Sequence, residues 1–340
     1  MSLTQPVSIL VVAPPGPLAE WSSAMLTKAA KQARVPIRHI DRTDTISAPA
    51  TPEIFHCQYP SLSAIALVKQ AVLHPVCIMA DPQWIVAAQR ARGASLLEAI
   101  RLATASTTAN LAIGRTSRSR LVYPDAQHST ESAANRLLSA CGLSADPDTL
   151  QDIMSALDMT GDDRLLSTLS RLYGLPDLTP LDPSDSATTS CVLNGAVAMA
   201  EGRTDTPIVW PTAVFLSGDQ PNSPAPMSAS VVGPSRVVLY GPYLHLPPAT
   251  YRGEVTIMFY GRIEEIAFQL DFLAGQTRMT SLRMEGRNSG AYRGRFKLVV
   301  EDPVPHIEIH LRNERGSIEG EVSLQELRFY VEEGNDISFP

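Results

Sequence analysis

The sequence has few cysteines and no long apolar run. Its four cysteines, Cys57, Cys77, Cys141 and Cys191, match no zinc-binding or CxxC spacing, which excludes a cysteine-based metal site and predicts reduced thiols. No apolar run reaches the ~20 residues that cross a bilayer, and the first residues lack the basic region and cleavage site of a signal peptide. We therefore expect a cytoplasmic protein without a membrane span.

Charge of one sign and several common site motifs are also missing. The formal net charge is −7 over 340 residues, whereas nucleic-acid-binding proteins usually carry a basic excess, so nucleic acid is excluded as a partner. The chain contains no G-x-G-x-x-G, G-x-x-x-x-G-K-[ST], H-E-x-x-H or G-x-S-x-G motif. These absences exclude the standard dinucleotide, nucleoside triphosphate, zinc-protease and serine-hydrolase sites, and we expect no cofactor.

Apolar strands alternate with helical patterns in the first part of the chain. Residues 7–13, VSILVVA, form a continuous apolar run, which is typical of a strand buried on both faces of a parallel sheet. Further strands and helices alternate up to Gly142, and helical patterns follow to about residue 201. The pattern predicts a three-layer α/β domain over residues 1–205, with a parallel sheet and a helical second part.

The periodicity changes after a stretch rich in proline, serine and glycine. That composition predicts a linker over residues 206–230. Short alternating runs such as EIAFQLDF, RFKLVV and HIEIHL then follow one another with turns between them. The pattern indicates an antiparallel, jelly-roll-like β-sandwich over residues 231–340, so that the fold class is α/β plus all-β.

Three stretches of the first domain resemble the sulfotransferase family. They are VVAPPGPLAEWSSAML, PVCIMADPQW and RSRLVYPDAQHSTES, in the family's order over about residues 7–143. The resemblance places Gly16, Pro17, Leu18, Ala19 and Glu20 in the family's phosphate-binding loop, and Ala80 at an arginine position. It therefore implies a degenerate donor site, since a proline lacks an N–H donor and a carboxylate repels phosphate.

His56 is the one residue that the resemblance offers as a catalytic base. It lies between the first two resembling stretches, in EIFHCQYP, and could take a proton from a sugar hydroxyl. A packed or surface histidine is the alternative interpretation. With the phosphate ligands absent, an active transferase would need replacement cations from Arg90, Arg92, Arg115, Arg118 and Arg120.

The stretches VVLYGPYLHLPPATYRGEVTIMFYG and GEVSLQELRFYV resemble carbohydrate-binding β-sandwich modules over residues 231–331. Sugar binding uses flat aromatic side chains against the C–H face of a pyranose, with polar groups beside them for the hydroxyls. Tyr243 and Tyr292 are the aromatic candidates, with Arg287 and Asn288 as their polar neighbours. Core or rim tyrosines are the alternative.

The stretch PHIEIHL places His306, Glu308 and His310 on one face of a strand. Two imidazoles and a carboxylate are possible metal ligands, although neighbours on one strand face are about 7 Å apart, which favours two ligands over three. A solvated strand face without metal is the other interpretation, and we expect no metal.

These patterns together favour a non-catalytic, glycan-associated protein or an accessory protein of polysaccharide biosynthesis. Its sandwich would bind a saccharide or a polysaccharide-assembly protein, beside a pseudo-sulfotransferase domain. Two alternatives stay open: an active sulfotransferase or glycosyltransferase acting on a surface polysaccharide, and a purely structural interaction module. The sequence also leaves open whether the chain forms a homo-oligomer.

Overall fold

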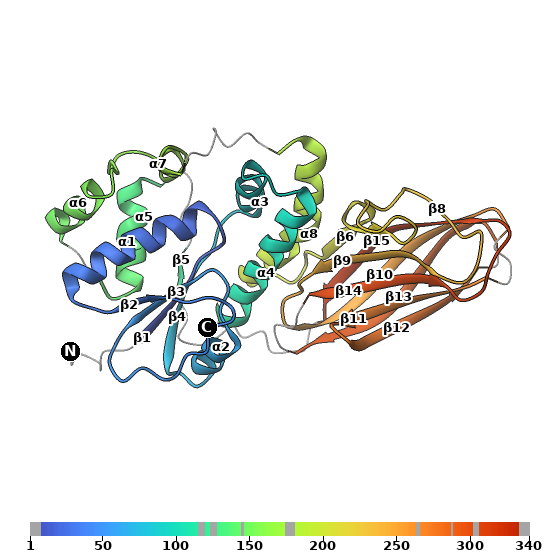
Figure 1. Cartoon of the computed structure of the whole chain (residues 1–340), viewed down its shortest axis with the longest axis horizontal. Coiled ribbons are helices and arrows are strands. Elements are labelled where there is room, and N and C mark those ends of the chain that lie inside the picture. Colours follow the sequence, from blue (N-terminus) through green and yellow to red (C-terminus); the bar gives the residue numbers. More distant parts are fainter. Residues whose placement is uncertain are drawn as a thin grey trace. The chain divides into compact units, whose positions relative to one another are not determined.

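The computed structural model describes residues 8–114, 120–122, 128–143, 146–173, 181–262, 266–286, 288–301 and 306–332. The chain forms two compact units (Figure 1). The first is built mainly from residues 1–95 and 109–181, and the second from residues 96–108 and 182–337. In the part of the chain that the structure describes, no helix is long and apolar enough to cross a membrane.

The first unit contains a five-stranded parallel sheet in the order β2-β3-β1-β4-β5. Its strands are β1 (Ser8–Val12), β2 (Ile37–His39), β3 (Ile54–Cys57), β4 (Leu73–Ile78) and β5 (Arg120–Val122). This order is neither the 3-2-1-4-5 order of dinucleotide-binding folds nor the flavodoxin-like 2-1-3-4-5 order. Because β1 lies between β3 and β4, the order reverses there, and ligands of open α/β sheets bind outside the carboxyl ends of strands at such points.

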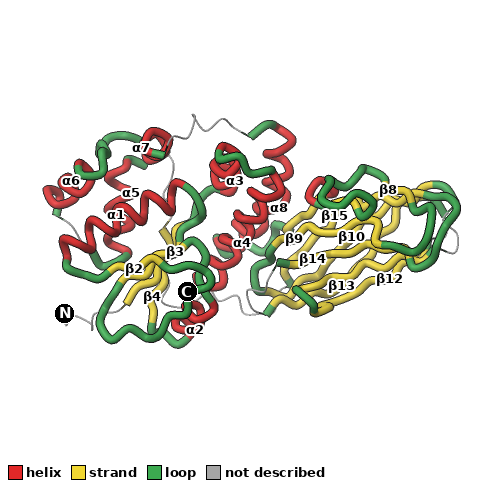
Figure 2. Tube along the Cα trace, viewed as in Figure 1, coloured by secondary structure: helices red, strands yellow, loops and turns green. Residues whose placement is uncertain are grey.

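Helices cover both faces of this sheet (Figure 2). They are α1 (Pro17–Ala33), α2 (Leu62–Lys69), α3 (Pro82–Ala91) and α5 (Thr130–Ala140), with the end of α4 (Leu96–Gly114), of which residues 109–114 belong to this unit. Helices α6 (Pro147–Ser155) and α7 (Leu165–Leu172) pack on α1 and α5. Side chains of Ser61, Asp81, Ser129 and Asp146 accept backbone N–H bonds as N-caps and fix where four of these helices begin.

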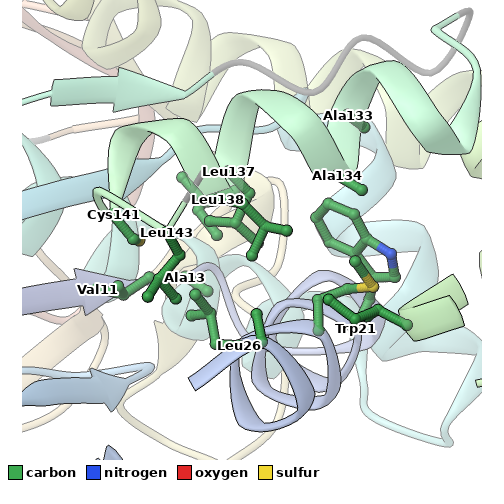
Figure 3. Packing of buried hydrophobic residues seen from close by; sticks show 14 of the residues in the cluster. Val11, Ala13, Trp21, Leu26, Ala133, Ala134, Leu137, Leu138, Cys141 and Leu143 are labelled. Atoms are coloured by element: carbon green, nitrogen blue, oxygen red, sulfur yellow. The ribbon is translucent and has the colours of Figure 1, made fainter. Parts of the chain in front are cut away.

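Two apolar cores make this unit three-layered. On one face Trp21 of α1 and Leu137 of α5 pack with Val11 of β1 (Figure 3). On the other face α2 packs against Leu10 and Phe55. The predicted three-layer α/β architecture is confirmed.

Two antiparallel sheets form the second unit. One has the order β13-β10-β15-β6, with β8 also pairing to β15, and the other the order β12-β11-β14-β9-β7. The strands of the first are β6 (Ile208–Pro211), β8 (Ala229–Ser230), β10 (Ala249–Tyr260), β13 (Gly290–Val300) and β15 (Glu321–Val331). Those of the second are β7 (Leu216–Ser217), β9 (Val237–Leu244), β11 (Ala267–Ala274), β12 (Thr277–Glu285) and β14 (Ile307–Asn313). Helix α8 (Pro183–Ala200) contacts β6, and the short 3-10 helix η1 (Thr212–Val214) follows that strand.

Aromatic side chains from both sheets meet between them. Phe259 of β10 lies 4.6 Å from Phe268 of β11, and Phe296 of β13 lies 4.4 Å from Phe272 of β11, measured between ring centroids. Phe329 of β15 packs within the same buried layer. The predicted antiparallel sandwich is confirmed, and these phenylalanines form its core.

The predicted linker at residues 206–230 and the domain boundary at residue 205 are wrong. Strand β6 pairs with β15, where Trp210 lies opposite Leu327, and β7 pairs with β9. The second unit also takes in α8 and residues 96–108. Proline, serine and glycine enrich this stretch because it consists of turns between very short edge strands, and edge strands tolerate proline.

Candidate functional site

The loop after β1 is closed by backbone hydrogen bonds and by the side chain of Gln89 from α3. Gly16, at φ 115°, is the N-cap of α1, and its carbonyl accepts the N–H groups of Ala19 and Glu20 at 3.0 and 3.2 Å. Gln89 Nε2 donates to the carbonyl of Pro15 at 3.1 Å and lies 3.2 Å from where a Cβ on Gly16 would be. Pro17, Leu18 and Ala19 are buried in the core. The backbone donors that a phosphate would need are thus used or covered.

Charge at this loop is also balanced without a ligand. Glu20 forms a 2.6 Å ion pair with Arg92, and Arg90 donates to the carbonyl of Ala94 at 3.1 Å. Ala80 packs against the core at the arginine position of the resemblance. The side chains of Arg115, Arg118 and Arg120 lie outside the described residues. The residues present here do not fit a nucleotide phosphate.

His56 is a hydrogen-bonded core residue. It lies in β3 with 4 % of its surface exposed, and its Nε2 is 2.9 Å from the Oγ of Ser22 in α1. Because the Ser22 hydroxyl donates to the carbonyl of Ala19 at 3.1 Å, the imidazole is assigned the tautomer that donates from Nε2. Burial, and secondarily the nearby His39, lowers the pKa of His56 to about 4. The imidazole is neutral at pH 7 and has no exposed face for a substrate.

Acidification is therefore expected to destabilise the first unit through His56. Its pKa is about 4 in the folded state and 6.5 in the unfolded chain, so between these values the unfolded state binds more protons. The stabilising contribution is complete above pH 6.5 and is lost as the pH falls toward 4, by about 3 kcal/mol at most. Urea unfolding of wild type and His56→Gln should show a shallower pH slope in the variant.

His128→Gln, the same substitution at a half-buried histidine of the first unit, is the matched control. An NMR titration of the His56 ring adds a measurement that needs no variant. Charging of this imidazole near pH 6.5 in the folded protein would contradict the prediction.

Polar side chains gather on the outer face of the sheet that contains β11 and β14. Ile307, Ile309 and Leu311 point into the core, so Glu308, His310 and Arg312 point outward. Cross-strand pairing joins His310 to Asp271 of β11 and to Tyr240 of β9, and Asp271 to Ser281 of β12. Ser281, Asp271, His310 and Tyr240 thus form one row across four strands. We call this surface, with Gln269, Glu308 and Arg312, the polar face.

A β-bulge brings Tyr243 to the same face. Leu244 lies opposite Ile307 and Pro242 opposite Glu308, so Tyr243 is the extra residue of β9, at a φ of 64°. Its hydroxyl donates to Glu308 Oε1 at 2.7 Å, and the same oxygen lies 2.7 Å from Nε2 of His310. Positive φ in a bulky residue is a strained conformation of the kind that clusters at binding sites.

Residues around Tyr243 fix its ring. The Arg101 guanidinium of α4 lies 5.0 Å from the ring centroid and donates from Nε to the carbonyl of Pro242 at 2.8 Å. Tyr240 and His306 make edge contacts with it at 6.2 and 5.2 Å. Burial, then the bond to Glu308, raises the pKa of Tyr243, so its hydroxyl stays a neutral donor.

The structure separates the tyrosines that the sequence grouped. Tyr243 lies in β9 of one sheet and Tyr292 in β13 of the other, where Tyr292 packs on Phe259 and bonds to the backbone of Asn288. Tyr292 lies opposite Ile257, eight residues or about 26 Å along β10 from the end that follows β9. Tyr243 and Tyr292 therefore cannot line one site. Arg287 lies outside the described residues.

His306, Glu308 and His310 do not converge on a metal position. His306 precedes β14 and contacts the Tyr243 ring, whereas Glu308 and His310 bond to each other. Among the described residues, no group of three or more histidine, cysteine, aspartate or glutamate side chains could hold a metal ion.

The sequence patterns did not single out Tyr240, Gln269, Asp271 or Ser281. The signal available was the strand FQLDF, in which a glutamine and an aspartate share one face while the alternate residues are apolar. Asp271 is 5 % exposed, and a buried carboxylate in a strand interior is uncommon unless it has partners.

Comparisons with known proteins give only distant likenesses. No protein family and no curated protein matches the chain. Among solved structures, TmCBM61 in complex with β-1,4-galactotriose is 13 % identical, with a TM-score of 0.25 over 39 % of this chain and 94 % of that one. The C-terminal CBM6 of LamC from Zobellia galactanivorans is 10 % identical, with a TM-score of 0.24 over 36 % and 98 %.

Other neighbours have unrelated roles. A cyclase from Fischerella sp. TAU in complex with an indole compound is 17 % identical, with a TM-score of 0.25 over 30 % of this chain and 61 % of that one. The VP2 subviral particle of infectious bursal disease virus is 10 % identical, with a TM-score of 0.27 over 39 % and 34 %. Scores at this level assign neither family nor ligand, so the architecture rests on this chain's own strand pairing: a parallel α/β unit and an antiparallel β-sandwich.

Proposed function

We propose that the β-sandwich unit binds a saccharide on the polar face. The row of Ser281, Asp271, His310 and Tyr240 carries this proposal, because it presents hydroxyl, carboxylate, imidazole and phenol groups in one line across β12, β11, β14 and β9. Adjacent strands are about 4.8 Å apart, so the row extends about 14 Å. A short oligosaccharide lying across the strands would meet these groups in turn.

The chemistry of the row suits sugar hydroxyls. Hydroxyl groups both donate and accept hydrogen bonds, and the row offers acceptors at Asp271 and donors or acceptors at the other positions. Tyr240 and Tyr243 add apolar ring surface at one end for the C–H face of a pyranose. Partial burial of the row also supports the proposal, since polar contacts gain strength where water is partly excluded.

We further propose that the α/β unit is a non-catalytic scaffold and that the whole protein is an accessory of polysaccharide assembly. Support comes from the closed loop at Gly16, from the Glu20–Arg92 ion pair and from the burial of His56. A thermal shift assay with adenosine 3′,5′-bisphosphate tests the scaffold proposal. A clear rise in melting temperature would overturn it.

Tyr240→Ala is expected to weaken saccharide binding about 30-fold, or about 2 kcal/mol, by removing an aromatic contact at the end of the row. A glycan array identifies a ligand for the full chain, and calorimetry then compares the variants. Tyr292→Ala is the matched control, because this tyrosine lies in the other sheet. Equal losses in both variants, or no binding across the array, would contradict the proposal.

A further inference from the structure

An incompletely neutralised pair of arginines lies on the polar face. Asp271 in β11 is flanked by Arg278 of β12 and Arg312 of β14. Arg278 Nε is 3.5 Å from Asp271 Oδ1, and Arg312 Nε is 3.7 Å from Oδ2. One carboxylate therefore faces two guanidinium groups, leaving one positive charge over.

Neither arginine uses all of its N–H donors in hydrogen bonds to other residues of the protein. Arg312 Nη2 donates to the Gln269 side chain, while its buried Nε has no hydrogen-bond partner. The side chains of Arg278 and Arg312 are 58 % and 42 % exposed, whereas that of Asp271 is 8 % exposed. Asp271 thus lies beneath the two guanidinium groups, and a ligand above it would meet the exposed parts of both, but not the buried Nε of Arg312.

Other charged side chains on this face have partners of their own. Arg283 of β12 contacts both Glu285 and Glu314, at 2.5 and 3.0 Å. Glu308 accepts from Tyr243 and lies against His310. The excess of positive charge is confined to the cluster of Arg278, Arg312 and Asp271, because Arg283 faces two carboxylates and Glu308 contacts the neutral hydroxyl of Tyr243 and the imidazole of His310.

We infer that the polar face selects an acidic saccharide, whose carboxylate or sulfate group is held between Arg278 and Arg312. This inference rests on the proposed saccharide binding. Guanidinium groups match oxyanions with paired, charge-assisted hydrogen bonds, and a single anionic group would neutralise the surplus charge. A neutral sugar would leave that charge uncompensated.

The test compares saccharides that differ only in charge. The full chain is titrated with an oligogalacturonide and with its methyl ester, and with a sulfated galactan oligosaccharide and its desulfated form. Binding of at least one acidic form should be about tenfold tighter than binding of its neutral counterpart, and the preference should shrink at high ionic strength. The arm that shows the preference identifies the anionic group.

Arg312→Gln and Arg278→Gln should each remove most of that preference while retaining binding of the neutral form. Arg293→Gln, at an exposed position of β13 in the other sheet, is the matched control. Equal affinity for acidic and neutral forms would overturn the inference and leave saccharide binding standing. Failure to bind any saccharide of the titrations and of the glycan array would overturn both.

Discussion

Gly253→Ala is expected to destabilise the β-sandwich unit by at least about 3 kcal/mol. Gly253 lies in β10 opposite Phe296 of β13, and a Cβ there would come within 2.1 Å of the Phe296 ring. The ring cannot retreat easily, because it packs against Phe272 at 4.4 Å and Phe329 at 6.0 Å. Urea unfolding followed through Trp210, a buried residue of this unit, measures the loss.

Gly161→Ala, at a glycine of the first unit, is the control, and its loss is followed through Trp84 of the same unit. The nearest atom to its added Cβ is the end of the Glu131 side chain at 3.2 Å, which can move away at little cost. This variant should lose less than about 1 kcal/mol. A similarly small loss in Gly253→Ala would show that the two sheets accommodate the extra methyl group, and would contradict the tight aromatic layer described above.

Local sequence patterns predicted the helices and strands better than they predicted which unit each of them belongs to. VSILVVA is one continuous apolar run, and a strand buried on both faces has this pattern wherever it occurs. The helical patterns up to about residue 201 predict helices of the first domain, yet α8 packs on β6 of the sandwich. Helical periodicity shows which side of a helix is apolar, but it does not show which core covers that side.

The candidate site was less predictable because it depends on pairings distant in sequence. Asp271 meets His310 only through the register of β11 on β14, and Tyr243 reaches Glu308 only because a bulge adds one residue to β9. A shift of one residue in either pairing would turn these side chains to the other face. His56 and the Gly16 loop could be located from sequence, whereas their burial depends on how α1 and α3 pack.

Trp21→Ala should destabilise the first unit by about 3–5 kcal/mol. Trp21 is fully buried on α1, and its ring lies beside Ala134 of α5 within the apolar cluster of this unit (Figure 3). Its removal leaves a cavity that these neighbours fill only in part, and it loosens the helix that carries Ser22, the partner of His56.

Fluorine NMR of fluorotryptophan-labelled protein follows each unit separately, because Trp84 lies in the first unit and Trp210 in the second. In Trp21→Ala the Trp84 signal should change at lower urea concentration than in wild type. In Gly253→Ala the Trp210 signal should instead be the one that changes at lower urea concentration than in wild type.

Leu62→Ala is the control in the first unit, since Leu62 is 78 % exposed and its truncation should cost less than about 0.5 kcal/mol. If Trp84 and Trp210 always lose their folded signals at the same urea concentration, the two units unfold as one cooperative structure. In that case a substitution in either core would also alter saccharide binding on the polar face.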